Sequence, residues 1–130
     1  MSPWIALVSL LTVLLMSACM FAVGMARGRH GVKAPATTGH PDFERVFRVQ
    51  MNTLEASVMF LPALWLAAAY GDPAWAASFG AIWLVGRVLY AVMYAREAQR
   101  RGAGFVITLL ALSALLVQGG GGIAKALLAA

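Results

Sequence analysis

An apolar segment without a single charged residue, residues 3–26, constrains this chain more than any other feature. A helix needs about 20 apolar residues to cross a hydrocarbon core of roughly 30 Å, and this segment is long enough to do so. Ser2 is a candidate N-cap and Pro3 suits the first helical position. The nearest positive charges follow the apolar segment, whereas a signal peptide has them in front, so we expect a retained membrane span.

Further membrane-spanning helices are expected over residues 42–70, 73–100 and 103–128. Asp72 is a candidate N-cap and Pro73 a candidate first residue of the helix over 73–100. Because the turn between 42–70 and 73–100 is so short, these two helices are expected to form an antiparallel hairpin. Gly102 and Gly104 are expected to bracket a second short turn. Because 62% of the 130 residues are hydrophobic and only 12% are charged, we expect one domain, 1–130, an all-α membrane protein built as an antiparallel four-transmembrane-helix bundle.

Four consecutive glycines, Gly119–Gly122, interrupt the last apolar segment. Each glycine costs a helix about 1 kcal/mol relative to alanine, so the helix could fray at this point. Small residues also allow helices to approach closely in a membrane. The sequence leaves both interpretations open.

The net charge of +5 arises from basic residues that gather in two places, residues 27–33 and 96–101. In a four-span bundle both clusters lie on one side of the membrane, and the termini lie on the other. By the positive-inside rule we expect the first and third loops in the cytoplasm. This explanation makes a nucleic-acid partner unnecessary. Cys19 is the only cysteine, which excludes an intrachain disulfide and a cysteine-based metal site.

A stripe of polar side chains runs along the segment 42–70. Arg45, Arg48, Asn52 and Glu55 are spaced by three, four and three residues and therefore share one face of a helix, with Gln50 to one side. An ionised side chain near the bilayer centre costs roughly 2.5–3.5 kcal/mol by insertion scales, so we expect this stripe to bind something polar.

The next segment offers a second polar edge. Tyr90 and Tyr94 share a helical face that continues toward Arg101, opposite the stripe. For Arg45 and Arg87, ion pairs or snorkelling to the interface are the favoured interpretation. The histidines His30 and His40 have no acidic or cysteine partner at ligand spacing in the sequence, so we expect no metal site.

Two sequence stretches, Glu44-Arg-Val-Phe-Arg-Val-Gln-Met-Asn-Thr-Leu-Glu55 and Gly86-Arg-Val-Leu-Tyr-Ala-Val-Met-Tyr-Ala-Arg96, resemble a known family. They are similar to the membrane-associated proteins in eicosanoid and glutathione metabolism (the MAPEG family), and the likeness spans nearly the whole chain. The pattern is nearest to the branch of microsomal glutathione transferases and cysteinyl-leukotriene synthases.

The resemblance implies a homotrimer that holds glutathione, as co-substrate, between neighbouring subunits. It implies that one subunit binds glutathione through Arg48, Asn52, Glu55, Tyr90 and Tyr94. It further implies that the neighbouring subunit contributes Arg27 and Gln50. It also implies that Arg101 is the catalytic residue, because it matches the family arginine that stabilises the glutathione thiolate.

Two departures bear on the reaction. The leukotriene-forming members have a second arginine and a tyrosine where this chain has Gly28 and Ala56. We therefore expect a detoxifying glutathione transferase or peroxidase that acts on a lipophilic electrophile or a lipid hydroperoxide. The alternatives are a non-catalytic lipid-binding or scaffold member of the family and, far less favoured, a small multidrug exporter. Such exporters have an acidic residue in the first span, which this chain lacks.

Overall fold

The computed structural model describes all 130 residues, and nearly all of them are helical. The elements follow in the order α1 (Pro3–His30), α2 (Pro41–Tyr70), α3 (Pro73–Arg96), the short 3-10 helix η1 (Ala98–Arg101) and α4 (Gly102–Ala129). Four helices are long and apolar enough to cross a membrane. The predicted all-α architecture with four long apolar helices is confirmed.

Helix starts lie where the capping residues predict them. The Ser2 hydroxyl accepts a hydrogen bond from the Trp4 amide, and the Asp72 carboxylate accepts one from the Ala74 amide. Pro3 and Pro73 occupy the first turns that follow these caps. Each cap satisfies a backbone donor that the helix itself leaves free.

Two helices end at other residues than the expected spans. The first helix continues past residue 26 to His30 and stops at Gly31, whose left-handed φ of 67° suits glycine at a helix C-terminus. The third helix ends at Arg96 and not at residue 100, because Glu97 is extended with φ −157° and the chain then turns through η1. The polar residues that follow the apolar segment of α1 continue the helix, whereas those at the end of α3 leave it. Hydropathy alone therefore misplaces both ends.

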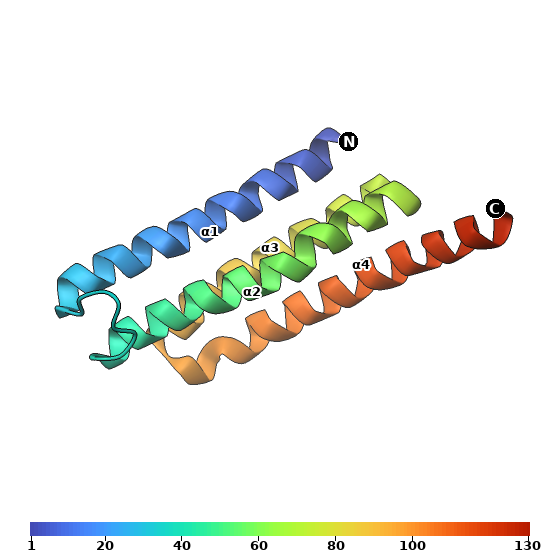
Figure 1. The fold of residues 1–130 in the computed structure, drawn as a ribbon. Coiled ribbons are helices and arrows are strands. Elements are labelled where there is room, and N and C mark those ends of the chain that lie inside the picture. Colours follow the sequence, from blue (N-terminus) through green and yellow to red (C-terminus); the bar gives the residue numbers. More distant parts are fainter.

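The helices lie side by side as a bundle in which chain neighbours run in opposite directions (Figure 1). The segment 31–40 and η1 lie at one end, and the α2–α3 turn and both chain termini lie at the other (Figure 1). The two basic clusters therefore share one end of the molecule. The core holds Phe60 of α2 and Trp83 of α3, whose rings stack with centroids 3.8 Å apart.

The glycines of α4 lie within the helix and form no turn, and three of them, Gly104, Gly119 and Gly122, mark close contacts. Gly102 and Gly104 both lie inside α4, so the predicted turn between them is wrong. A Cβ on Gly104 would lie 2.5 Å from the backbone nitrogen of Tyr90, which shows how tightly α4 approaches α3. The run Gly119–Gly122 stays helical, and Gly119 packs on the backbone of α2. Close packing is the correct interpretation of the glycine run.

Candidate functional site

The polar stripe of α2 exists as a continuous surface. Arg48 and Glu55, two helical turns apart, approach each other to 4.0 Å between Nη1 and Oε1. Their side chains remain 53% and 57% exposed, so both charged groups stay available to a ligand. A half-exposed ion pair of this length contributes little to stability, about 0–1 kcal/mol. The position of this ion pair beside a cleft is more informative than its contribution to stability.

Asn52, midway along the stripe, links α2 to α3. Its side-chain amide donates a hydrogen bond of 2.6 Å to the hydroxyl of Tyr90. Tyr90 is buried, and its ring stacks on that of Tyr94 with centroids 5.5 Å apart. The bond holds Asn52 and Tyr90 in a defined relative position, and the stacking extends the tyrosine surface toward the basic end of the bundle.

Arg101 reaches the same region from η1. Its guanidinium lies 5.7 Å from the Tyr94 ring centroid, and Nη1 donates a hydrogen bond of 3.0 Å to the Ala98 carbonyl. The carbonyl and the aromatic face orient the guanidinium without neutralising it. Arg101 therefore keeps a full positive charge for a ligand.

A cleft of about 300 Å³ collects these groups. Asn52 and Glu55 line it from α2, Tyr90 from α3 and Arg101 from η1. Met59 and the exposed Phe105 add apolar surface. An adjacent cleft of about 360 Å³ is lined in part by Arg48 and Tyr94. The two clefts together hold six of the eight residues predicted for the site.

Arg87 is a member of the cleft that the sequence interpretation missed. It is only 3% exposed and was expected to form an ion pair or to snorkel to the interface, but Nε donates instead to the Thr53 hydroxyl at 3.3 Å. Its guanidinium stacks 4.1 Å from the Tyr90 ring centroid, and Nη2 is buried without a hydrogen-bond partner. A buried unpaired cation is costly, which favours an anionic ligand in this cleft. The sequence feature that could have identified Arg87 is its position three residues before Tyr90, which places both side chains on one face of the helix.

Arg27 and Gln50 lie outside both clefts. Arg27 donates hydrogen bonds to the carbonyls of Val32 and Ala36 at 3.3 and 2.7 Å, and its guanidinium lies over the Phe43 ring. Gln50 is half-buried on α2. A single chain therefore does not bring these two residues together with the other predicted site residues.

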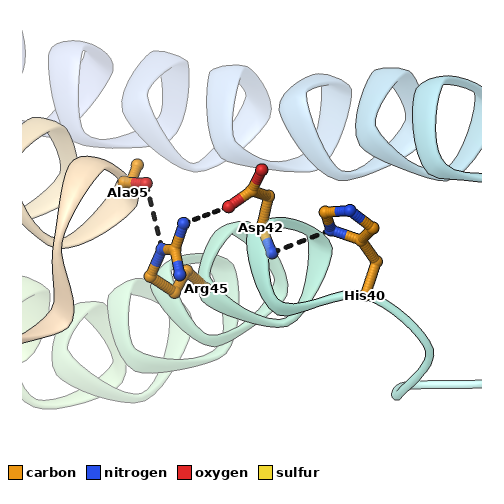
Figure 2. Close-up of polar contacts among 4 residues, drawn as sticks. All are labelled: His40, Asp42, Arg45 and Ala95. Carbon is orange, nitrogen blue, oxygen red and sulfur yellow. Dashed lines mark hydrogen bonds and ion pairs between the residues drawn. The ribbon is translucent and has the colours of Figure 1, made fainter.

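The histidines are not isolated, contrary to the sequence interpretation. His30 and His40 stack with ring centroids 4.0 Å apart, and candidate ligand atoms of both lie within 4.8 Å of one on Asp42. The fold creates this neighbourhood by joining the end of α1 to the start of α2. His40 Nδ1 already accepts a hydrogen bond from the Asp42 amide as the cap of α2, and the Asp42 carboxylate pairs with Arg45 (Figure 2). Helix capping therefore accounts for much of this arrangement.

Comparison with known proteins places the chain among membrane proteins of related sequence. The model of the MAPEG family matches residues 5–121. The chain is 39% identical over 124 residues to microsomal glutathione S-transferase 2 of Homo sapiens, which covers 95% of this chain and 84% of that protein. It is 43% identical over 112 residues to leukotriene C4 synthase of Cavia porcellus, covering 86% and 75%. An uncharacterized protein of Synechocystis sp. is 50% identical over 114 residues, covering 88% and 83%.

Proposed function

The chain belongs to the MAPEG family, and from this membership we propose that it is an integral membrane glutathione transferase. Its substrates are lipophilic electrophiles that reach the protein through the bilayer. A related activity, the reduction of lipid hydroperoxides by glutathione, uses the same activated thiolate. The similarity to glutathione transferases supports glutathione as the co-substrate.

The observation that supports this proposal best is the convergence of Asn52, Glu55, Tyr90 and Arg101 on one cleft. Glutathione has two carboxylates, an ammonium group and a thiol. Glu55 supplies an anion for the ammonium group, and Arg48 supplies a forked donor for a carboxylate. Arg87 adds a buried positive charge beside the cleft, which favours a second anionic group. A non-catalytic lipid-binding or scaffold protein would not require an unpaired cation such as Arg101 next to these residues.

Arg101 provides the chemistry in this proposal. A thiol of pKa about 8.5 is lowered by two units when its thiolate gains roughly 2.7 kcal/mol of preferential stabilisation. The thiolate sulfur then forms a bond to the electrophilic atom, and the leaving group departs with its electron pair. With a hydroperoxide, the thiolate attacks the terminal oxygen and releases the alcohol. A second glutathione then converts the sulfenic acid to the disulfide and water.

The apolar surroundings of the cleft fit a substrate dissolved in lipid. Met59 and Phe105 line the cleft and are 57% and 52% exposed. An electrophile that slides between the apolar helices can thus approach the polar cleft without first entering water. The same contacts would give a hydrophilic electrophile no advantage.

We further propose that the site is completed in a homotrimer, with Arg27 and Gln50 supplied by the neighbouring subunit. Their position outside the clefts of their own chain supports this assignment. Leu54 and Val58 beside Glu55 are 48% and 66% exposed, so α2 presents apolar surface for a subunit contact next to the cleft. The basic end of the bundle faces the cytoplasm in this proposal.

Glutathione binding to purified protein in detergent tests the proposal, with Glu55→Gln as the decisive variant. A hydrogen bond to a charged group is worth about 1.5–3 kcal/mol, so the affinity should fall about ten- to hundredfold. Glu97→Gln is the matched control, because Glu97 pairs with Arg100 outside the cleft and its loss should leave the affinity unchanged. A wild-type protein that does not bind glutathione, or equal effects of both variants, contradicts the proposal.

A further inference from the structure

A second basic cleft lies on another side of the bundle, between the end of α1, the start of α2 and the end of α3. It has a volume of about 560 Å³, shares no residue with the cleft of Glu55 and Arg101, and shares only Arg45 with the cleft of Arg48 and Tyr94. Arg29, Arg45 and Arg96 line it from three different helices. Arg29 and Arg96 belong to the two basic clusters that the sequence explains by membrane topology, and Arg45 is the first residue of the polar stripe.

The charges of this cleft are unbalanced. Arg45 is neutralised by Asp42 and also donates through Nε to the Ala95 carbonyl at 3.3 Å, which ties α2 to α3 (Figure 2). The ion pairs of the chain involve only Arg45, Arg48 and Arg100. Arg29 and Arg96, both exposed, therefore bring two unpaired positive charges to the cleft. Two guanidinium forks on facing helices suit a phosphate group.

The depth of the cleft matches the headgroup region of a bilayer. Helix α1 has 28 residues, a length of about 42 Å at 1.5 Å per residue, whereas the hydrocarbon core is roughly 30 Å thick. Arg29 is the penultimate residue of α1, and Arg96 is the last residue of α3. Both guanidinium groups therefore lie near the level of lipid phosphates when the bundle spans a membrane.

Apolar surface continues from the cleft along the same helices. Met25 lines the cleft and is 66% exposed, and Phe21, one turn before it on α1, is 68% exposed. Val92 lies one turn before Arg96 on α3 and is 45% exposed. An acyl chain can lie on this surface while its phosphate contacts the arginines. A free phosphate ion would contact only the arginines of the cleft and not this apolar surface.

We propose that this cleft binds the headgroup of an anionic phospholipid, with an acyl chain along the exposed side chains of α1 and α3. Basic pockets between membrane helices are suited to such headgroups. The bound lipid would join the ends of α1 and α3 through its phosphate. Its two unpaired arginines, Arg29 and Arg96, line neither cleft of the proposed glutathione site, so the proposal does not rest on the proposed function.

Native mass spectrometry of the detergent-solubilised protein tests the proposal, using equimolar phosphatidylglycerol and phosphatidylcholine. The wild-type protein should retain phosphatidylglycerol in preference by about tenfold. The double variant Arg29→Gln/Arg96→Gln should retain the two lipids almost equally. The control Lys33→Gln/Arg100→Gln removes the same charge from the same end outside the cleft and should keep the preference.

Three results would overturn the proposal. A wild-type protein without preference shows that the cleft is not a lipid site. An equal loss in both double variants shows a general effect of surface charge. Displacement of the lipid by an equimolar amount of inorganic phosphate shows that only a free anion is recognised. Lipid retention is read directly, so these results remain separate from any failure of glutathione binding.

Discussion

Arg87 is the residue whose environment departs most from the sequence interpretation. An intramembrane arginine is expected to find a carboxylate, yet Arg87 has a hydroxyl, an aromatic ring and an unpartnered nitrogen. Its nearest surroundings come from α2 and α3, and the cleft that it lines opens toward Glu55 and Arg101. Arg87 therefore lines the candidate site as well as taking part in the packing of the bundle.

The substitution Arg87→Met separates these two roles. Replacing a buried unpaired charge with an apolar side chain of similar length should leave the thermal unfolding temperature unchanged or raise it. Glutathione affinity should fall by about tenfold, because a positive charge close to the bound anion is lost. Isothermal titration and thermal unfolding of the same preparation measure both quantities.

The control for this experiment is Arg96→Met, which removes a positive charge from the same helix outside the Glu55 cleft. Its glutathione affinity should equal that of the wild-type protein. If Arg87→Met lowers the unfolding temperature and leaves glutathione affinity intact, Arg87 serves the structure alone.

At the scale of the helices, the approach of α4 to α3 shapes the site. Gly104 faces the backbone of Tyr90 so closely that a Cβ would lie 2.5 Å from its nitrogen. Tyr90 in turn accepts the hydrogen bond from Asn52. One glycine in the first turn of α4 thus sets the position of a tyrosine in the cleft.

We predict that Gly104→Ala forces α4 away from α3 and disturbs the Asn52–Tyr90 contact. Both glutathione affinity and the unfolding temperature should fall in this variant. Gly102→Ala is the matched control, since nothing lies within 4 Å of a Cβ at that position. There alanine, the better helix former by about 1 kcal/mol, should be neutral or stabilising. Equal behaviour of the two variants would contradict this role of Gly104.

Sequence patterns predicted the helices better than their ends. Length, hydropathy and the caps at Ser2 and Asp72 identify all four helices, because these properties are local. The ends near His30 and Arg96 were missed because polar residues beyond the membrane can continue a helix or break it. The role of Gly104 was also missed, since a close contact between helices depends on a partner that the local sequence does not reveal.

At the scale of the whole molecule, the topology brings the predicted site residues of α2, α3 and η1 to the basic half of the bundle. Periodicity placed Arg48, Asn52 and Glu55 on one face, and antiparallel pairing placed Tyr90 and Arg101 opposite them. Arg27 and Gln50 stay apart from this group in a single chain. The contribution proposed for them requires a second subunit, so the sequence of one chain predicts it only through family resemblance.

The molecule as a whole also separates two basic regions, for which we propose different ligands. One contains Arg101 beside the polar stripe, and the other contains Arg29 and Arg96 between α1 and α3. The hydropathy pattern and the positive-inside rule treat these arginines alike. Only the packing of the helices shows which of them share a cleft.

Thiolate formation tests the central claim most directly, namely that this membrane bundle binds glutathione and activates it through Arg101. The measurement is the ultraviolet difference absorbance of the thiolate at saturating glutathione and about pH 7, for wild type, Arg101→Gln and the control Arg100→Gln. If the bound thiol has a pKa of about 6.5 and returns to about 8.5 without Arg101, the thiolate share falls from roughly three quarters to roughly 3%. Arg100→Gln should match the wild type. A wild-type protein without the thiolate signal, or an undiminished signal in Arg101→Gln, would contradict the account.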